Sequence, residues 1–276
     1  MATGTRASVA GFAALLVALA ALWLYGFADP GNALEDALHD LKQAKIRYSY
    51  FPEVDALVVE GKDVTDETLW HLRNVSSLRR LTLDDASVTD NGIASLVNIN
   101  RLESLSLQGV AISGIGLKDS PFASTLTRLN LSRSGVQNTG LLYIGGLSQL
   151  EYLSLAGTDI SDAGIAQLAR LTNLKRLYLT STNLSDAGMP SVLSCKLLEE
   201  LNVSRTRVSD VAALLLAKKH QLKTLYISNT SLTDRGLLAL TKNPSLTRLD
   251  VFDTKVTRDG LAQAQKDRPD IVIGHR

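Results

Sequence analysis

Aliphatic residues recur every 24 positions along most of this 276-residue chain. The pattern LxxLxL occurs nine times, with neither insertion nor deletion between copies, and its first position holds Val54, Leu78, Leu102, Leu126, Leu150, Leu174, Leu198, Leu222 and Leu246. A fixed period of this length is typical of solenoids, in which a unit buries its apolar face only by stacking on its neighbours. We number the positions of each unit from its first aliphatic residue.

Residues 150–173 show what one unit is expected to form. Leu153 and Leu155 alternate with polar residues, which predicts a short strand. Residues 156–158 have the composition of a turn, and residues 164–171 have helical spacing after two candidate N-caps, Ser161 and Asp162. Each unit is therefore expected to run from strand to turn to helix to loop.

Two polar rows accompany the aliphatic positions. Position 13 is aspartate in six units, at Asp66, Asp90, Asp162, Asp186, Asp210 and Asp234. Evenly spaced aspartates could be metal ligands, but an acidic residue at each helix start explains them more simply. Position 9 is threonine in five units, at Thr158, Thr182, Thr206, Thr230 and Thr254. Their hydroxyls are expected to satisfy buried backbone groups between neighbouring turns, and Lys62, Ala86 and Val110 interrupt the row.

The repeated unit LxxLxLxxTxITDxGLxxLxxLxx resembles the leucine-rich-repeat superfamily from residue 54 to the C-terminus. It is similar to the cysteine-containing subclass of F-box substrate receptors, and more so to the repeats of membrane-anchored bacterial proteins. It departs from the F-box type in its shorter period, in threonine where cysteine recurs, and in lacking F-box helices. The resemblance implies an α/β fold, a right-handed leucine-rich-repeat solenoid with a parallel sheet on the concave face and helices on the convex face.

Residues 1–29 form a separate N-terminal segment. Residues 7–27 carry no charge and are nearly all apolar, and about 20 such residues span a bilayer as a helix. Trp23 and Tyr25 lie at the far end, where amphipathic rings favour the interface. We therefore expect a transmembrane helix that anchors the chain, with a cleaved signal peptide as the alternative. The repeats are expected outside the cytoplasm, in the periplasm or at the cell surface, or secreted if the segment is cleaved.

The two ends of a solenoid must be covered. Residues 30–53 are expected to form a capping helix and a linker, because Leu34, Ala37, Leu38 and Leu41 fall on one helical face. Residues 54–276 are expected to hold the nine units, followed by a terminal strand at residues 270–274.

Two units depart from the pattern. In the third unit, Pro121 falls where other units have helix and Ser120 falls where others have leucine, so a short or absent helix is expected. In the seventh unit, residues 211–217 lack the usual glycine and predict the best helix of the array.

Side chains for catalysis are not arranged in any known motif. The four histidines are far apart in the repeat frame, and Cys195 occupies an aliphatic position, which predicts a core residue. Lys+Arg number 29 and Asp+Glu 28, so the near-neutral charge gives no case for a nucleic-acid partner. We expect no catalytic residue, no metal, no cofactor and no small-molecule substrate.

The concave face remains as the candidate site. Side chains at positions 3 and 5 point outward from the sheet, and in-register strands stack them about 4.8 Å apart. Tyrosine and arginine anchor protein interfaces, although strand surfaces favour tyrosine without any function. The candidate binding residues on this face are Arg128, Tyr152, Arg176, Tyr178, Arg205 and Tyr226.

These features bear on four possible functions. A membrane-anchored scaffold that binds a protein partner accounts for the apolar segment, the solenoid and the tyrosine and arginine residues together. An F-box-like adaptor of a ubiquitin-ligase complex would need an adaptor-binding module, which the sequence lacks. A self-associating structural envelope protein would need an apolar outer face. An enzyme has no support among the residues, and fold alone does not decide function.

Overall fold

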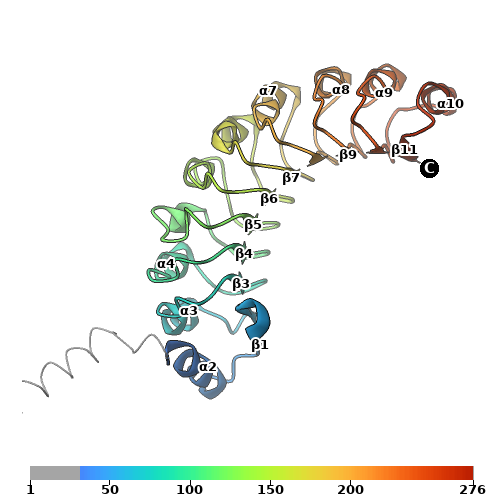
Figure 1. The fold of residues 1–276 in the computed structure, drawn as a ribbon. Coiled ribbons are helices and arrows are strands. Elements are labelled where there is room, and N and C mark those ends of the chain that lie inside the picture. Colours follow the sequence, from blue (N-terminus) through green and yellow to red (C-terminus); the bar gives the residue numbers. More distant parts are fainter. Residues whose placement is uncertain (1–31, 276) are drawn as a thin grey trace, which may run out of the picture.

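The structure, a computed structural model, describes residues 32–275. Their backbone forms an arc in which the strands line the inner side and the helices line the outer side (Figure 1). The strands belong to one sheet of 11, ordered along the arc as they are in the sequence. The membrane segment predicted for residues 7–27 lies outside the described residues. Within residues 32–275, no helix combines the length and apolarity needed to cross a bilayer.

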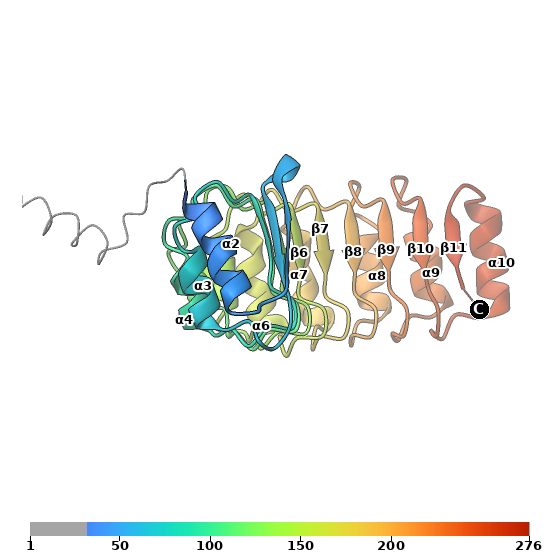
Figure 2. The same cartoon turned by 90° about the horizontal axis from the view of Figure 1, so that it is seen from below.

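The strands of the nine units, and the terminal strand β11 that follows them, are short and in register. Neighbours from β2 to β11 pair in parallel with partners 24 residues apart, as Leu105 faces Leu129. Figure 2 looks onto this row of strands, and β6 to β11 are visible side by side. The strands are β2 (Ala56–Val59), β3 (Arg80–Thr82), β4 (Ser104–Ser106), β5 (Arg128–Asn130), β6 (Tyr152–Ser154), β7 (Arg176–Tyr178), β8 (Glu200–Asn202), β9 (Thr224–Tyr226), β10 (Arg248–Asp250) and β11 (Val272–Gly274). The predicted parallel sheet is confirmed.

The outer elements are short helices, one or two to a unit. They are α3 (Asp66–Leu72), α4 (Asp90–Ala94), η2 (Ile115–Leu117), α5 (Leu141–Ile144), α6 (Asp162–Ile165), η3 (Ala166–Arg170), η4 (Asp186–Gly188), α7 (Met189–Leu193), α8 (Asp210–Leu216), α9 (Asp234–Leu240) and α10 (Arg258–Asp267), where η marks a 3-10 helix. The seventh unit was expected to have the best helix, but α8 has 7 residues, as do α3 and α9, and α10 has 10. A tight turn and a parallel neighbour on each side limit helix length more than local propensity does.

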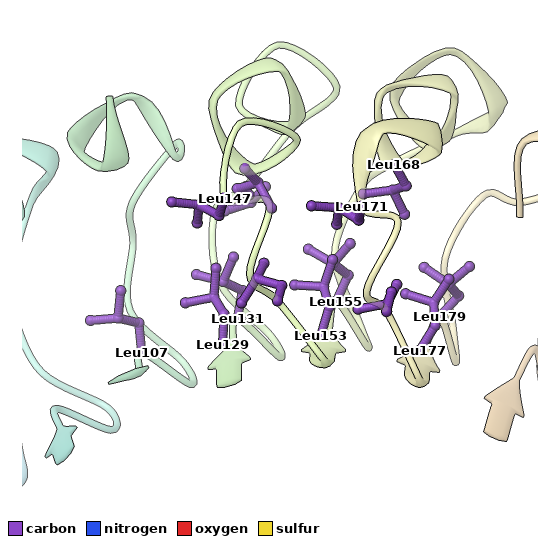
Figure 3. Close-up of a cluster of buried hydrophobic side chains, with 14 of the residues drawn as sticks. Leu107, Leu129, Leu131, Leu147, Leu153, Leu155, Leu168, Leu171, Leu177 and Leu179 are labelled. Atoms are coloured by element: carbon purple, nitrogen blue, oxygen red, sulfur yellow. The ribbon is translucent and has the colours of Figure 1, made fainter. Parts of the chain in front are cut away.

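Leucines from the strand and helix sides of each unit fill the interior of the arc. Leu129, Leu153 and Leu177 are fully buried, and so is Leu168 from the helix side. Figure 3 shows these two layers of side chains facing one another in the interior of the arc. Cys195 is also fully buried, at the position where the two preceding units carry Leu147 and Leu171. The aliphatic positions of the repeat therefore form one continuous core, as the spacing predicted.

Two elements cover the N-terminal end. Helix α2 (Ala33–Gln43) buries Ala33, Ala37 and Leu41, and it packs against α3. Strand β1 (Tyr48–Phe51) pairs antiparallel with β2, followed by the 3-10 turn η1 (Pro52–Val54). Residues 48–51 were expected to be part of a linker. They form an edge strand instead, because the backbone groups of β2 on that side need partners.

The third unit replaces its helix with a single 3-10 turn and one aromatic side chain. Residues 115–117 form η2, so the short helix predicted from Pro121 is confirmed. Phe122 is fully buried in the core. It lies two positions after Ser120, which stands where other units place an aliphatic residue. Its large ring occupies the volume that a helix leucine fills elsewhere.

The aspartates at position 13 connect neighbouring units. The carboxylate of Asp186 accepts hydrogen bonds from the backbone N–H of Ser209, at 2.9 Å, and from its hydroxyl, at 2.6 Å. Ser209 is the N-cap of the next helix, α8, and its hydroxyl accepts from the N–H of Val211. The expected acidic residue does stand at each helix start, yet its carboxylate holds the N-cap of the following unit. The same pair of bonds joins Asp66 to Thr89, Asp162 to Ser185, Asp210 to Thr233 and Asp234 to Thr257.

The threonine row acts within each unit. The hydroxyl of Thr158 donates to the carbonyl of Leu155 at 2.6 Å, three residues earlier. The prediction that these hydroxyls join neighbouring turns is therefore wrong, because a side chain this short reaches the carbonyl of its own turn first. Ser134 stands at position 9 of the fourth unit and was not part of the predicted threonine row. Its hydroxyl makes the same bond, to the carbonyl of Leu131.

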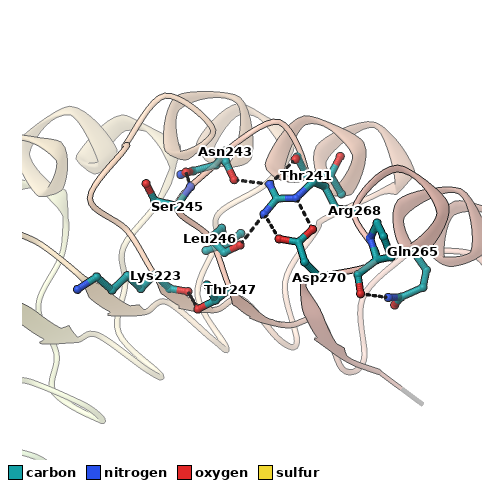
Figure 4. Close-up of polar contacts among 10 residues, drawn as sticks. Lys223, Thr241, Asn243, Ser245, Leu246, Thr247, Gln265, Arg268 and Asp270 are labelled. Carbon is teal, nitrogen blue, oxygen red and sulfur yellow. Dashed lines mark hydrogen bonds and ion pairs between the residues drawn. The ribbon is translucent and has the colours of Figure 1, made fainter.

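Arg268 closes the C-terminal end. Its guanidinium donates to the carbonyl oxygens of Thr241, Asn243 and Leu246, at 3.1, 2.7 and 3.2 Å. Asp270 accepts two further bonds from it, and Figure 4 shows the side chain inserted among these groups. Lys219 and Asn243 donate in the same way to backbone carbonyls of the preceding unit, so Arg268 joins the ninth unit to the eighth by the same kind of contact.

Replacing Arg268 with alanine is expected to loosen α10 and β11 by about 1–2 kcal/mol, because three carbonyls lose their donor. Hydrogen exchange of the backbone amides is the measurement. Amides of residues 258–274 should exchange faster, while those of β5 to β7 keep their protection. Equal acceleration across the whole array would contradict this local role.

Candidate binding site on the concave sheet

Tyr152 lies between two arginines at the middle of the concave sheet. The strand register places Arg128 of β5 and Arg176 of β7 beside it. The guanidinium carbon of Arg128 lies 4.5 Å from the centroid of the Tyr152 ring, and that of Arg176 lies 5.6 Å from it. Both distances are within the range of cation–π attraction, so the two cations hold the ring in place.

Tyr178 adds a second ring to this group. The centroids of the Tyr152 and Tyr178 rings are 5.3 Å apart, with their planes tilted by 43°. Tilted pairs at this distance attract one another beyond the area they bury. Arg128, Tyr152, Arg176 and Tyr178, which we call the tyrosine–arginine cluster, are all partly or fully exposed to solvent. The cluster is therefore ordered by its own contacts while its outer surface stays free.

Glu200 fixes the Tyr178 ring from the far side. The Tyr178 hydroxyl donates to the Glu200 carboxylate, with 2.5 Å between the oxygens. Burial, reinforced by the hydrogen bond and the negative charge of Glu200, raises the pKa of Tyr178 well above its ordinary value. The hydroxyl thus stays protonated at neutral pH and serves as a donor, and the ring is held on both sides.

Replacing Tyr178 with phenylalanine is expected to remove a late step from the alkaline titration of tyrosinate absorbance. The pKa of Tyr178 in the folded protein lies above its ordinary value of 10.0. This group therefore stabilises the fold below pH 10, and that stability is lost as pH rises through the folded pKa. The matched control is Tyr143→Phe, which removes one tyrosine from helix α5 instead of the concave sheet. A late step that survives Tyr178→Phe and disappears in Tyr143→Phe would contradict the assignment.

The other two candidate residues lie outside the cluster. Tyr226 of β9 is approached by Arg248, whose guanidinium carbon is 5.7 Å from the ring centroid, and Arg248 also pairs with Asp250 at 3.2 Å. Arg205 lies in the turn after β8 in a left-handed conformation, with φ 55°. Its guanidinium makes no ion pair or ring contact with any residue in 32–275. The structure thus brings four of the six predicted residues together and leaves Tyr226 and Arg205 apart.

Glu200, Arg248 and Asp250 take part in the site, although sequence reasoning did not select them. Glu200 and Arg248 stand at position 3, beside residues that were selected, and Asp250 stands at position 5. The sequence did contain a signal for them. Each lies one strand or two residues away from a tyrosine or from a residue of opposite charge. Cross-strand pairing of unlike groups is expected on a sheet surface.

The arrangement suits recognition of a surface by contact. Rigid rings flanked by guanidinium groups offer both apolar area and fixed positive charge. No group of three or more histidine, cysteine or acidic side chains in residues 32–275 is placed to hold a metal ion. The aspartates of position 13, which sequence spacing made candidates, have their oxygens occupied by N-cap groups of the next unit.

Comparison with known proteins agrees with the repeat geometry. A family model described as a leucine-rich repeat matches residues 123–145, 147–169, 170–191 and 242–262. No curated protein matches the sequence. The fold is similar to internalin C2 of Listeria monocytogenes, with a TM-score of 0.57 and 24% identity over 77% of this chain and 84% of that chain. It is also similar to an internalin (InlF) of the same organism, with a TM-score of 0.51 and 18% identity over 74% and 69% of the two chains.

The chain is a leucine-rich-repeat protein. Nine in-register units, the four matched segments and the two internalin folds agree on this class. At these identities the solved structures speak for the fold alone. Neither the family model nor the two internalins point to the F-box subclass.

Proposed function

We propose that this chain is a non-enzymatic scaffold that binds a protein partner on its concave sheet. The observation that carries the proposal is the tyrosine–arginine cluster. Its rings and guanidinium groups are ordered by contacts at 4.5–5.6 Å, yet they lie on the surface and contribute nothing to the leucine core. Rigid aromatic residues beside arginine are the side chains that dominate protein interfaces.

The proposal includes attachment to a membrane through residues 7–27, with the repeats outside the cytoplasm. Its support is the uncharged apolar run of the sequence alone. An anchored arc would present its concave face to partners in the same compartment. If the segment is cleaved, the same binding face would belong to a secreted protein.

Self-association through the outer face is less well supported. Trp70, Leu142 and Leu214 are exposed on α3, α5 and α8, at 54%, 48% and 39%. Val97, Ile115, Leu197 and Val211 are exposed as well. These side chains stand at different positions of their units, 14 for Ile115 and Val211, 17 for Trp70, Leu142 and Leu214, 20 for Val97 and 24 for Leu197, so they form no single row along the arc.

The test is capture of a partner by the full-length chain from membrane and envelope extracts. A Tyr152/Arg176/Tyr178 triple-alanine variant should lose the partner while its thermal melting stays unchanged. A Trp70/Leu142/Arg170 triple-alanine variant, altered on the convex helices, should keep it. Retention of the partner by the concave variant, or its loss only in the convex one, would move the site to the helices and refute the proposal.

A further inference from the structure

Three arginines on the concave face are left without an acidic partner. Arg80, Arg128 and Arg176 each begin a strand, namely β3, β5 and β7. None of the three forms an ion pair with a carboxylate of residues 32–275. One position earlier, the cations are neutralised: Arg79 pairs with Glu103, Lys175 with Glu151 and Lys223 with Glu199. Within the strands, position 3 therefore carries unpaired positive charge while position 2 is neutralised, and Arg205 adds a further unpaired cation in the turn after β8.

The spacing of this row is regular. Arg80 faces Ser104, Ser104 faces Arg128, Arg128 faces Tyr152 and Tyr152 faces Arg176, so a single strand separates each arginine from the next. With neighbouring strands about 4.8 Å apart, successive arginines start about 9.6 Å apart at the backbone. Because the row lies on the inner side of the arc, the ends of the side chains come somewhat closer (Figure 1).

This distance selects among the conformations of a bound segment. In a polyproline II helix, every third residue lies on the same face and is about 9.3 Å further along. A β-strand returns to the same face after about 6.7 Å, which is too short. An α-helix returns to the same face after seven residues and about 10.5 Å. This is too long, because the ends of the arginine side chains lie closer together than their backbones. Carboxylates three residues apart on a polyproline II segment would therefore meet all three arginines.

The rings between and beside the arginines fit the same kind of segment. Tyr152 lies between Arg128 and Arg176, and its ring contacts that of Tyr178. Tyrosine surfaces of this sort receive proline rings in known polyproline recognition. Two strands beyond Arg176, Thr224 of β9 stands where a fourth arginine would continue the row. Glu200, on the intervening strand β8, would repel a further carboxylate, so the row ends at β7.

We infer that the partner presents an extended proline-rich segment with acidic residues at every third position, bound across β3 to β7. This inference rests on the proposed function and specifies the partner of the same site. The segment would run along the arc, perpendicular to the strands. Its three carboxylates would pair with Arg80, Arg128 and Arg176, and its prolines would lie on Tyr152 and Tyr178.

Two labelled peptides of identical composition test the spacing, by fluorescence anisotropy with the full-length protein in detergent. One repeats Pro-Pro-Glu three times; the other places the three glutamates together between prolines. We expect the spaced peptide to bind at least tenfold more tightly, and its affinity to fall as salt rises. Equal affinity of the two peptides would overturn the inference, because charge alone would then explain binding.

Two matched variants locate the contact. Arg80/Arg128/Arg176→Gln should abolish the preference for the spaced peptide, while Arg101/Arg170/Arg235→Gln removes the same charge from exposed sites outside the concave row and should keep it. Retention of the preference by the concave variant would refute the inference. Tighter binding of a single-stranded oligonucleotide than of the spaced peptide, lost in the concave variant, would refute it in favour of a nucleic acid.

Failure of this inference is distinguishable from failure of the proposed function. If neither peptide binds, yet the captured partner is still lost in the Tyr152/Arg176/Tyr178 variant, the concave scaffold stands and the acidic segment is refuted. If the partner is retained by that variant as well, both are refuted.

Discussion

Replacing Phe122 with alanine is expected to lower the free energy of unfolding by about 3–5 kcal/mol. The ring is fully buried in the third unit, where η2 has only three residues and Ser120 offers no aliphatic side chain. The neighbouring backbone is fixed by pairing on both sides, so the cavity cannot collapse. Denaturant unfolding of the full-length chain is the measurement.

Two variants make the Phe122 result specific. Phe122→Leu keeps most of the apolar volume and should cost clearly less than the alanine variant. Val97→Ala, at a side chain that is 57% exposed, should change stability by less than about 0.5 kcal/mol. A loss below about 1 kcal/mol in Phe122→Ala would show that the third unit does not depend on this ring.

Replacing Asp90 with alanine is expected to cost about 2–3 kcal/mol, the second largest effect. Its carboxylate accepts from the N–H groups of Ser113, Gly114 and Gly116 and from the Ser113 hydroxyl, at 2.8–3.1 Å. These bonds hold the loop that leads into η2, where the third unit has least helix. Partial exposure of the carboxylate to solvent limits the expected loss of stability.

The same site predicts a dependence on acid. Burial opposes ionisation of Asp90, but the hydrogen bonds from Gly116, Ser113 and Gly114 outweigh it and hold its pKa below the ordinary value of 3.8. Because the folded pKa is lowered, the stabilisation is complete above pH 3.8 and is lost as pH falls through the folded pKa. Asp90→Asn should keep part of the bonding, as Asn138 does for Ser161, and flatten this dependence. An unchanged acid profile in Asp90→Asn would assign the effect to other carboxylates.

The fold was largely predictable because the same pattern of apolar and polar residues recurs in every unit. Alternation around Leu153 and Leu155 specifies a strand, and the 24-residue period specifies its register with the next one. Phe122 was missed because it stands at a position that is polar or glycine in other units, such as Asn98 and Gly146. Its burial follows from the shape of the preceding turn, which no single unit reveals.

The role of the aspartates was missed for a different reason. The partner of Asp186 is Ser209, 23 residues away in the chain, whereas N-cap reasoning considers only neighbours in sequence. Strand β1 was likewise hidden, because its pairing with β2 satisfies an edge that exists only once the sheet has formed.

The sequence predicted which face of the sheet carries the candidate site, but not which side chains on that face contact one another. Strand alternation places Arg128, Tyr152, Arg176 and Tyr178 on the concave side, and the structure finds them in contact. The bond from Tyr178 to Glu200 depends on side-chain conformations, and the isolation of Arg205 depends on its turn. Neither can be read from residue spacing.

Site-specific photocrosslinking tests the central claim most directly. A photoreactive phenylalanine analogue would replace Tyr226, which lies on the concave sheet two strands beyond Tyr178, or Trp70, which is 54% exposed on convex helix α3. With the partner present, we expect a covalent adduct from position 226 and none from position 70. An adduct from position 70 alone would contradict a binding site on the concave face.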